Sequence, residues 1–65
     1  MYYVKLFNKE NQCILNAPFD KKNSAIEYFN TKADRRTYFD IYPFIEYDRI
    51  ELLNDNAVLF DCEVH

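Results

Sequence analysis

The chain has 65 residues, of which 49 % are hydrophobic and 18 % aromatic, and its formal net charge at pH 7 is −3. It is too apolar for a disordered chain and too short for several cores, so we expect one folded domain over 1–65. Glycine is absent, which excludes the glycine-rich loops that approach a bound phosphate closely. Left-handed turn positions must then fall to Asn and Asp.

The first part of the chain predicts a β-hairpin. Residues 2–7 and 12–19 alternate side chains between two faces, and the turn sequence NKEN joins them, so we expect two antiparallel strands. Pro18 lacks a backbone N–H and is expected at an edge or at a strand end. The side chains of the second strand expected to face the core are Cys13, Leu15 and Ala17.

Residues 24–36 give the clearest helix signal. Ser24 and Glu27 match the S-x-x-E pattern of a capping box, which predicts the start of the helix. Arg35 and Arg36 fall in its last turn, where cations interact favourably with the helix dipole. Four apolar side chains lie within an arc of about 100° and predict the face that packs on the core: Ala25, Ile26, Phe29 and Ala33.

The second half predicts further strands. Pro43 interrupts the next stretch, so we expect an edge strand over 38–47 rather than a helix, with Phe39, Ile41 and Ile45 inward. Residues 49–53 either continue this strand or bend into a new one, and 54–56 predict a tight turn. In the last strand, 57–64, Leu59 does not fit the alternation and is expected to be exposed. The residues expected to face inward are Val58, Phe60, Cys62 and Val64.

This β-β-α-β-β order predicts an α+β fold. A small, mostly antiparallel sheet with one helix packed on one face buries all of the apolar stripes economically. No stretch reaches the length of a membrane span, and Met1–Phe7 lacks the apolar run of a signal peptide. We therefore expect a cytoplasmic protein that does not engage a membrane.

The residues that support catalysis or metal binding are few. His65 is the only histidine and Ser24 the only serine, so no nucleophile stands beside a base. Cys62 and His65 are three residues apart, which places them on opposite faces of a strand, and a zinc site needs about four ligands. We expect no enzyme, no cofactor and no metal site, and we expect Cys13 and Cys62 to be reduced, buried thiols rather than a disulfide.

Charge divides the chain into two unequal halves. Residues 1–36 carry seven basic and four acidic groups, a net charge of +3, whereas 37–65 carry one basic group, Arg49, and seven acidic groups, a net charge of −6. The acidic half also holds the aromatic-rich sequence TYFDIYPFIEYDRIE at 37–51. Such asymmetry predicts a charged interaction surface, although acids that only maintain solubility around an aromatic core would produce it too.

The acidic half predicts a partner-binding surface. Alternation leaves about half of these side chains outside, where aromatics anchor a partner and carboxylates take the place of phosphates. The predicted contact residues are Asp40, Tyr42, Phe44, Glu46, Asp48, Glu51, Asp61 and Glu63. The partner expected for such a DNA-mimicking surface is a protein whose basic groove normally holds nucleic acid.

Two alternatives remain open. In the first, a nucleic-acid-binding regulator uses one helix flank, with Tyr28 stacking on a base and Lys32, Arg35 and Arg36 on phosphates. The sequence pI near 4.9 opposes this interpretation, because the rest of the surface would repel the ligand. In the second, edge strands of two copies pair in a homodimer with a structural or assembly role.

The chain is short, acidic, without glycine and rich in the Asn, Lys, Ile, Tyr and Phe of AT-rich codons. In this overall character it resembles the small proteins that phages and mobile elements make to disable host defence or host enzymes, such as anti-CRISPR proteins and inhibitors of DNA-repair or restriction enzymes. The resemblance covers no specific residue. It implies a non-enzymatic inhibitor that acts in the bacterial cytoplasm on a host protein that handles nucleic acid.

Overall fold

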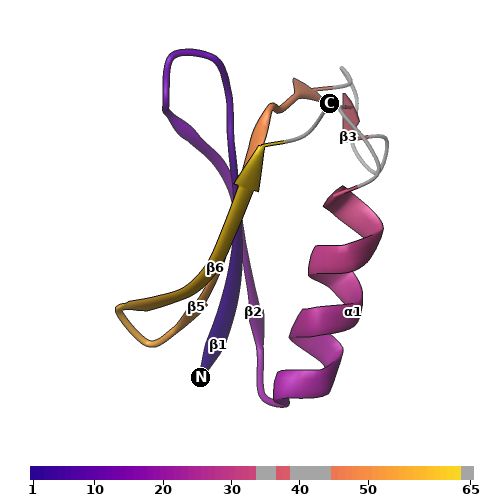
Figure 1. Ribbon diagram of the computed structural model, residues 1–65, viewed down its shortest axis with the longest axis vertical. Helices are drawn as coiled ribbons and strands as arrows, with labels where there is room; N and C mark the ends of the chain where they lie inside the picture. The colour runs from indigo at the N-terminus through magenta and orange to yellow at the C-terminus, as the bar shows by residue number, and fades with distance from the viewer. Residues whose placement is uncertain (34–36, 39–44, 64–65) are drawn as a thin grey trace.

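A computed structural model of the chain describes residues 1–33, 37–38 and 45–63 (Figure 1). The four longer strands form one antiparallel sheet in the order β2-β1-β5-β6, and the helix contacts β1, β2 and β5. This is the predicted α+β fold with one helix on one face of the sheet. The elements are β1 (Tyr2–Phe7), β2 (Cys13–Phe19), α1 (Lys22–Ala33), β3 (Thr37–Tyr38), β4 (Ile45–Glu46), β5 (Arg49–Asn54) and β6 (Ala57–Glu63).

The core lies between α1 and the two central strands. Val4 and Leu6 of β1 alternate towards the helix, as do Ile50 and Leu52 of β5, and all four are fully buried. Ala25 of α1 is also fully buried, because its small side chain lets the helix approach the sheet. Partly buried side chains of α1 complete the predicted stripe and pack against this cluster: Ile26, Phe29 and Ala33.

The turns are made without glycine, as predicted. Asn11 has a φ of 62° and Asp55 a φ of 54°, and these residue types tolerate the left-handed region best after glycine. In the first turn the side-chain oxygen of Asn8 accepts hydrogen bonds from the backbone N–H groups of Glu10, at 3.0 Å, and Gln12, at 2.9 Å. The Asn8 side chain therefore organises the backbone between β1 and β2.

The predicted helix start at Ser24 is wrong. The N–H of Ala25 donates to the carbonyl of Lys21 at 3.2 Å, so the helix begins at Lys22 and Ser24 is an exposed residue of its first turn. The connection from β2 to α1 is only two residues long. Packing of Ala25 on the sheet, rather than a capping box, therefore decides where the helix begins.

The single edge strand predicted over 38–47 is also wrong in the part that the structure describes. Thr37 pairs with Glu46 and Tyr38 pairs with Ile45 in a separate antiparallel ladder, so Tyr38 and Ile45 belong to two short strands rather than to one. Phe39, Ile41 and Pro43 lie outside the described residues. Tyr47 follows β4 and is buried, with its hydroxyl donating to the carbonyl of Lys32 at 2.8 Å.

The side chains of β6 differ most from the prediction. Val58 and Phe60, expected to face inward, are 51 % and 55 % exposed. The register between β5 and β6 shifts between Leu52 and Leu53, which leaves Leu59 as an extra, bulged residue. Val58 is thereby opposite Leu53, while Phe60 stays on the helix side, where its ring centroid is 6.4 Å from that of Phe29. Val64 lies outside the described residues.

The two cysteines occupy opposite edges of the sheet. Cys13 belongs to β2 and Cys62 to β6, and neither forms a disulfide. Cys13 is exposed rather than buried, because a register shift between Leu6 and Phe7 interrupts the alternation there. Cys62 packs against the core, and burial, with a smaller effect from the charge of Asp61, raises the pKa of its thiol.

Candidate functional site

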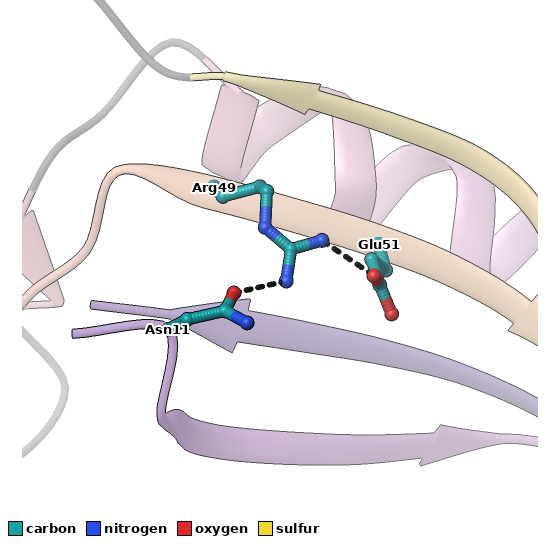
Figure 2. Close-up of polar contacts among 3 residues, drawn as sticks. All are labelled: Asn11, Arg49 and Glu51. Atoms are coloured by element: carbon teal, nitrogen blue, oxygen red, sulfur yellow. Dashed lines mark hydrogen bonds and ion pairs between the residues drawn. The ribbon is translucent and has the colours of Figure 1, made fainter. Parts of the chain in front are cut away.

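The face of the sheet opposite α1, here called the outer face, gathers charged side chains from three strands. Lys5 of β1 is directly opposite Glu51 of β5, which is in turn opposite Asp61 of β6. Arg49 of β5 is opposite Glu63 of β6. Figure 2 shows Arg49 and Glu51 projecting from β5 on the side away from α1. Alternation along regular strands places the other residues of these rows on the same face.

Arg49 is the centre of a polar cluster on the outer face (Figure 2). Its Nη1 lies 2.5 Å from Oε2 of Glu51, and its Nη2 donates to Oδ1 of Asn11 at 2.6 Å. Its guanidinium carbon lies 4.1 Å from the ring centroid of Phe7, in a cation–π contact. Arg49 therefore offsets the charge of Glu51 and connects the β1–β2 turn to β5.

The unbalanced negative charge of this face lies on β6. Asp61 and Glu63 are both exposed, and in the part of the chain that the structure describes neither forms a hydrogen bond or an ion pair. Asp61 is directly opposite Glu51, and like charges in that position repel one another. A cationic partner would relieve this repulsion.

Replacing Arg49 by methionine tests the cluster. Arg49→Met keeps a long apolar stem over Phe7 but removes the contacts to Asn11 and Glu51, so we expect the free energy of unfolding to fall by about 1 kcal/mol. Urea unfolding measures this change. Lys5→Met is the control, because it removes a cation from the same face and should cost no more than about 0.5 kcal/mol. Equal losses in the two variants would show that net charge matters rather than the geometry of Arg49.

The predicted contact residues are partly brought together. Glu51, Asp61 and Glu63 share the outer face, as described above. Glu46 is exposed in β4, and Asp48 is half-buried with its N–H donating to the carbonyl of Phe7 at 3.0 Å. Asp48 therefore lies at the end of the sheet where Arg49 is opposite Glu63. The remaining predicted residues, Asp40, Tyr42 and Phe44, are outside the described ranges.

Of the four residues predicted for the helix flank, the described ones are Tyr28 and Lys32, and both pack against other side chains. Lys32 is only 6 % exposed, with its Nζ 5.1 Å from the ring centroid of Tyr28. The Tyr28 ring packs against Phe19, with the ring centroids 5.2 Å apart. The aliphatic stem of a lysine can cover apolar surface in this way, and it places Lys32 in the interior rather than on the predicted basic flank. Arg35 and Arg36 are outside the described residues.

Sequence reasoning missed two features near this site. Val58, Leu59 and Phe60 form a continuous exposed apolar run on β6; the break in alternation at Leu59 pointed to its own exposure, but the exposure of Val58 and Phe60 was not predicted. A shallow hollow also lies on the outer face, with a polar lining of Tyr3, Lys5, Asn16, Asp55 and Asn56. Over 1–33, 37–38 and 45–63, no group of three or more His, Cys, Asp or Glu side chains is placed to hold a metal ion, and no helix is long and apolar enough to cross a membrane.

Comparison with known proteins adds no relative to this description. No protein-family model, no curated protein and no solved structure matches the chain. The class of protein that the fold and the site define is thus a small α+β domain with an acidic outer face.

Proposed function

We propose that the chain is a small, non-enzymatic inhibitor that places its acidic outer face on a basic, nucleic-acid-handling surface of a bacterial host protein. The observation that carries this proposal is the position of Asp61 and Glu63. Both are exposed on one strand, beside Glu51, and without a cation of their own among the described residues. In this proposal the chain is a phage or mobile-element product that acts in the cytoplasm.

The geometry suits a DNA mimic. Residues two apart on a strand are separated by about 7 Å, so Asp61 and Glu63 present two carboxylates in a row. Glu51 lies beside Asp61 on the neighbouring strand, with its Cβ about 5 Å from that of Asp61, but its charge is offset by Arg49. A rigid sheet fixes this array before binding. A basic groove that normally neutralises phosphates would find negative charges at fixed spacing and would be attracted over about 8–10 Å at ordinary salt.

Direct binding of nucleic acid is supported less well. Two of its four predicted residues, Tyr28 and Lys32, are packed against one another and against the body of the protein. The carboxylates of Asp61 and Glu63 on β6 would repel phosphates. The acidic surface therefore remains the better candidate for the site of action.

Charge reversal tests the proposed function. The protein is first used to capture partners from a nuclease-treated lysate of a low-GC bacterium, and the affinity of the purified partner is then measured. Asp61→Lys combined with Glu63→Lys should weaken binding at least ~100-fold, because each change replaces an attraction by a repulsion. The matched control, Glu10→Lys with Glu27→Lys, changes two exposed acids of the first turn and of α1 by the same net charge. It should change the affinity less than ~3-fold.

Two results would contradict the proposal. One is a partner that binds the β6 double variant as tightly as the original protein. The other is a capture that disappears when nuclease is added, since that would mean that nucleic acid bridges the two proteins.

A further inference from the structure

The two edges of the sheet are not equivalent. β2 forms one edge and β6 the other. The N–H of Asp55 donates to the carbonyl of Met1 at 2.9 Å, which fixes the phase of the β1–β5 ladder. Backbone groups of successive residues point to opposite neighbours in an antiparallel sheet. The backbone N–H and C=O groups of Leu53 and Glu51 therefore point towards β1. Those of the residues between them on β5 point towards β6.

The same phase decides which groups of β6 face outward. The backbone groups of Ile50 and Leu52 point towards β6, where these residues pair with Cys62 and Phe60, respectively. The backbone N–H and C=O groups of Cys62 and Phe60 therefore point inward, and those of Asp61 and Glu63 point to the outer edge. These outward groups are available to pair with a further strand, because β6 has β5 as its only neighbour among the described strands.

Pro18 removes one hydrogen-bond donor from the edge formed by β2. Tyr3 pairs with Leu53 on one side, so its backbone groups point towards β5, and its partner on the other side is Pro18. The nitrogen of Pro18 therefore lies on the outer edge, where it offers no N–H. β6 contains no proline, and Val58, Leu59 and Phe60 leave apolar surface exposed along it. Proteins usually protect such an edge.

We infer that β6 accepts an extended segment of the partner as a fifth, antiparallel strand, with basic side chains opposite Asp61 and Glu63 and apolar side chains beside Phe60. The inference rests on the proposed function for the basic character of the partner. Residues directly opposite one another in an antiparallel pair have side chains on the same face. A segment that alternates Lys or Arg with Val or Ile thus neutralises the outer face and covers the exposed ring of Phe60.

A second copy of the chain is a poorer occupant of this edge. Within the regular part of β6, only Asp61 and Glu63 point their backbone groups outward. Every antiparallel register between two copies there sets one of these two residues opposite Asp61 or Glu63 of the other copy. Like charges directly opposite are destabilising, so charge selects a basic segment over self-pairing.

A synthetic peptide of eight alternating lysine and valine residues tests the inference, with binding measured by calorimetry and by NMR shifts of the Asp61 and Glu63 amides. Asp61→Ala should weaken binding about 3–10-fold through lost charge. Asp61→Pro should weaken it at least ~10-fold further, because it also removes an outward N–H. Circular dichroism establishes that each variant is folded.

Peptide chemistry gives a second test on the unaltered protein. N-methylation of the lysine amides, which would face β6, should abolish measurable binding. N-methylation of the valine amides, which would face away, should change the affinity less than ~3-fold. Equal affinities for the two methylated peptides, or the absence of binding by the unmodified one, would overturn the inference.

Two further outcomes are distinguishable. If Asp61→Ala and Asp61→Pro bind equally while Asp61→Lys with Glu63→Lys loses the captured partner, strand addition fails and the charge-based function stands. If the protein alone is a dimer that Asp61→Pro dissociates, the edge belongs to a second copy and the basic segment is rejected.

Discussion

Leu52→Ala is expected to lower the free energy of unfolding by about 2–5 kcal/mol. Leu52 is fully buried on the helix side of β5, between β1 and β6, so its loss leaves a cavity in the middle of the core. A domain of this length has a total stability of roughly 3–10 kcal/mol. A large part of the protein should therefore be unfolded at 37 °C, which thermal and urea unfolding followed by circular dichroism would measure.

Leu59→Ala is the matched control. Leu59 belongs to the same hairpin, but it is the bulged residue and is 39 % exposed. Its truncation should cost no more than about 1 kcal/mol. If Leu59→Ala destabilised the protein as much as Leu52→Ala, the described register between β5 and β6 would be wrong.

Tyr47→Ala is expected to cost about 3–5 kcal/mol, as for other large buried aromatics. Tyr47 is 2 % exposed and connects two distant segments, because its hydroxyl donates to the carbonyl of Lys32 near the end of α1. Tyr47→Phe separates the contribution of the buried ring from that of the hydroxyl's hydrogen bond. It keeps the ring but removes the donor, and a carbonyl deprived of its partner in a buried site costs about 1–3 kcal/mol.

Tyr3→Phe controls for the loss of a tyrosine hydroxyl as such. Tyr3 is half-buried on the outer face, and its change should stay within about 0.5 kcal/mol. The measurement is again the midpoint and slope of urea unfolding. A neutral Tyr47→Phe would mean that water replaces the hydroxyl at the Lys32 carbonyl.

Periodicity predicted the elements whose burial is regular. β1 and the hairpin follow from alternating side chains, and the helix stripe follows from the arc that holds Ala25 and Phe29. The left-handed turns at Asn11 and Asp55 follow from the absence of glycine. These features depend on local preferences that agree with the tertiary packing, which is why they can be derived without it.

The errors arise where tertiary contacts override a local signal. The capping pattern at Ser24 is a valid helix start, but a two-residue connection and the burial of Ala25 begin the helix earlier. Lys32 has the spacing of a basic flank, yet its stem is buried beside Tyr28. The bulge at Leu59 depends on the pairing of β6 with β5, and a register shift cannot be seen in one strand alone.

The candidate site was predictable in part for the same reason. Strand alternation puts Asp61 and Glu63 on one face, and it does so without knowledge of strand order. That Asp61 is opposite Glu51, and Glu63 opposite Arg49, follows only from the antiparallel pairing of β5 and β6. The hydrogen bond from Arg49 to Asn11, 38 positions away, needed the turn between β1 and β2 to be brought to the same face.

Pro18 has a consequence for stoichiometry. A sheet grows by successive addition only when each new member offers an edge like the one it has occupied. Here one edge, β2, lacks an N–H at Pro18, next to the last residue of the strand, and the other edge, β6, bears carboxylates that repel a second copy of the chain. Association along the sheet should therefore end after one addition. We therefore expect the protein to form one-to-one complexes and not to seed filaments.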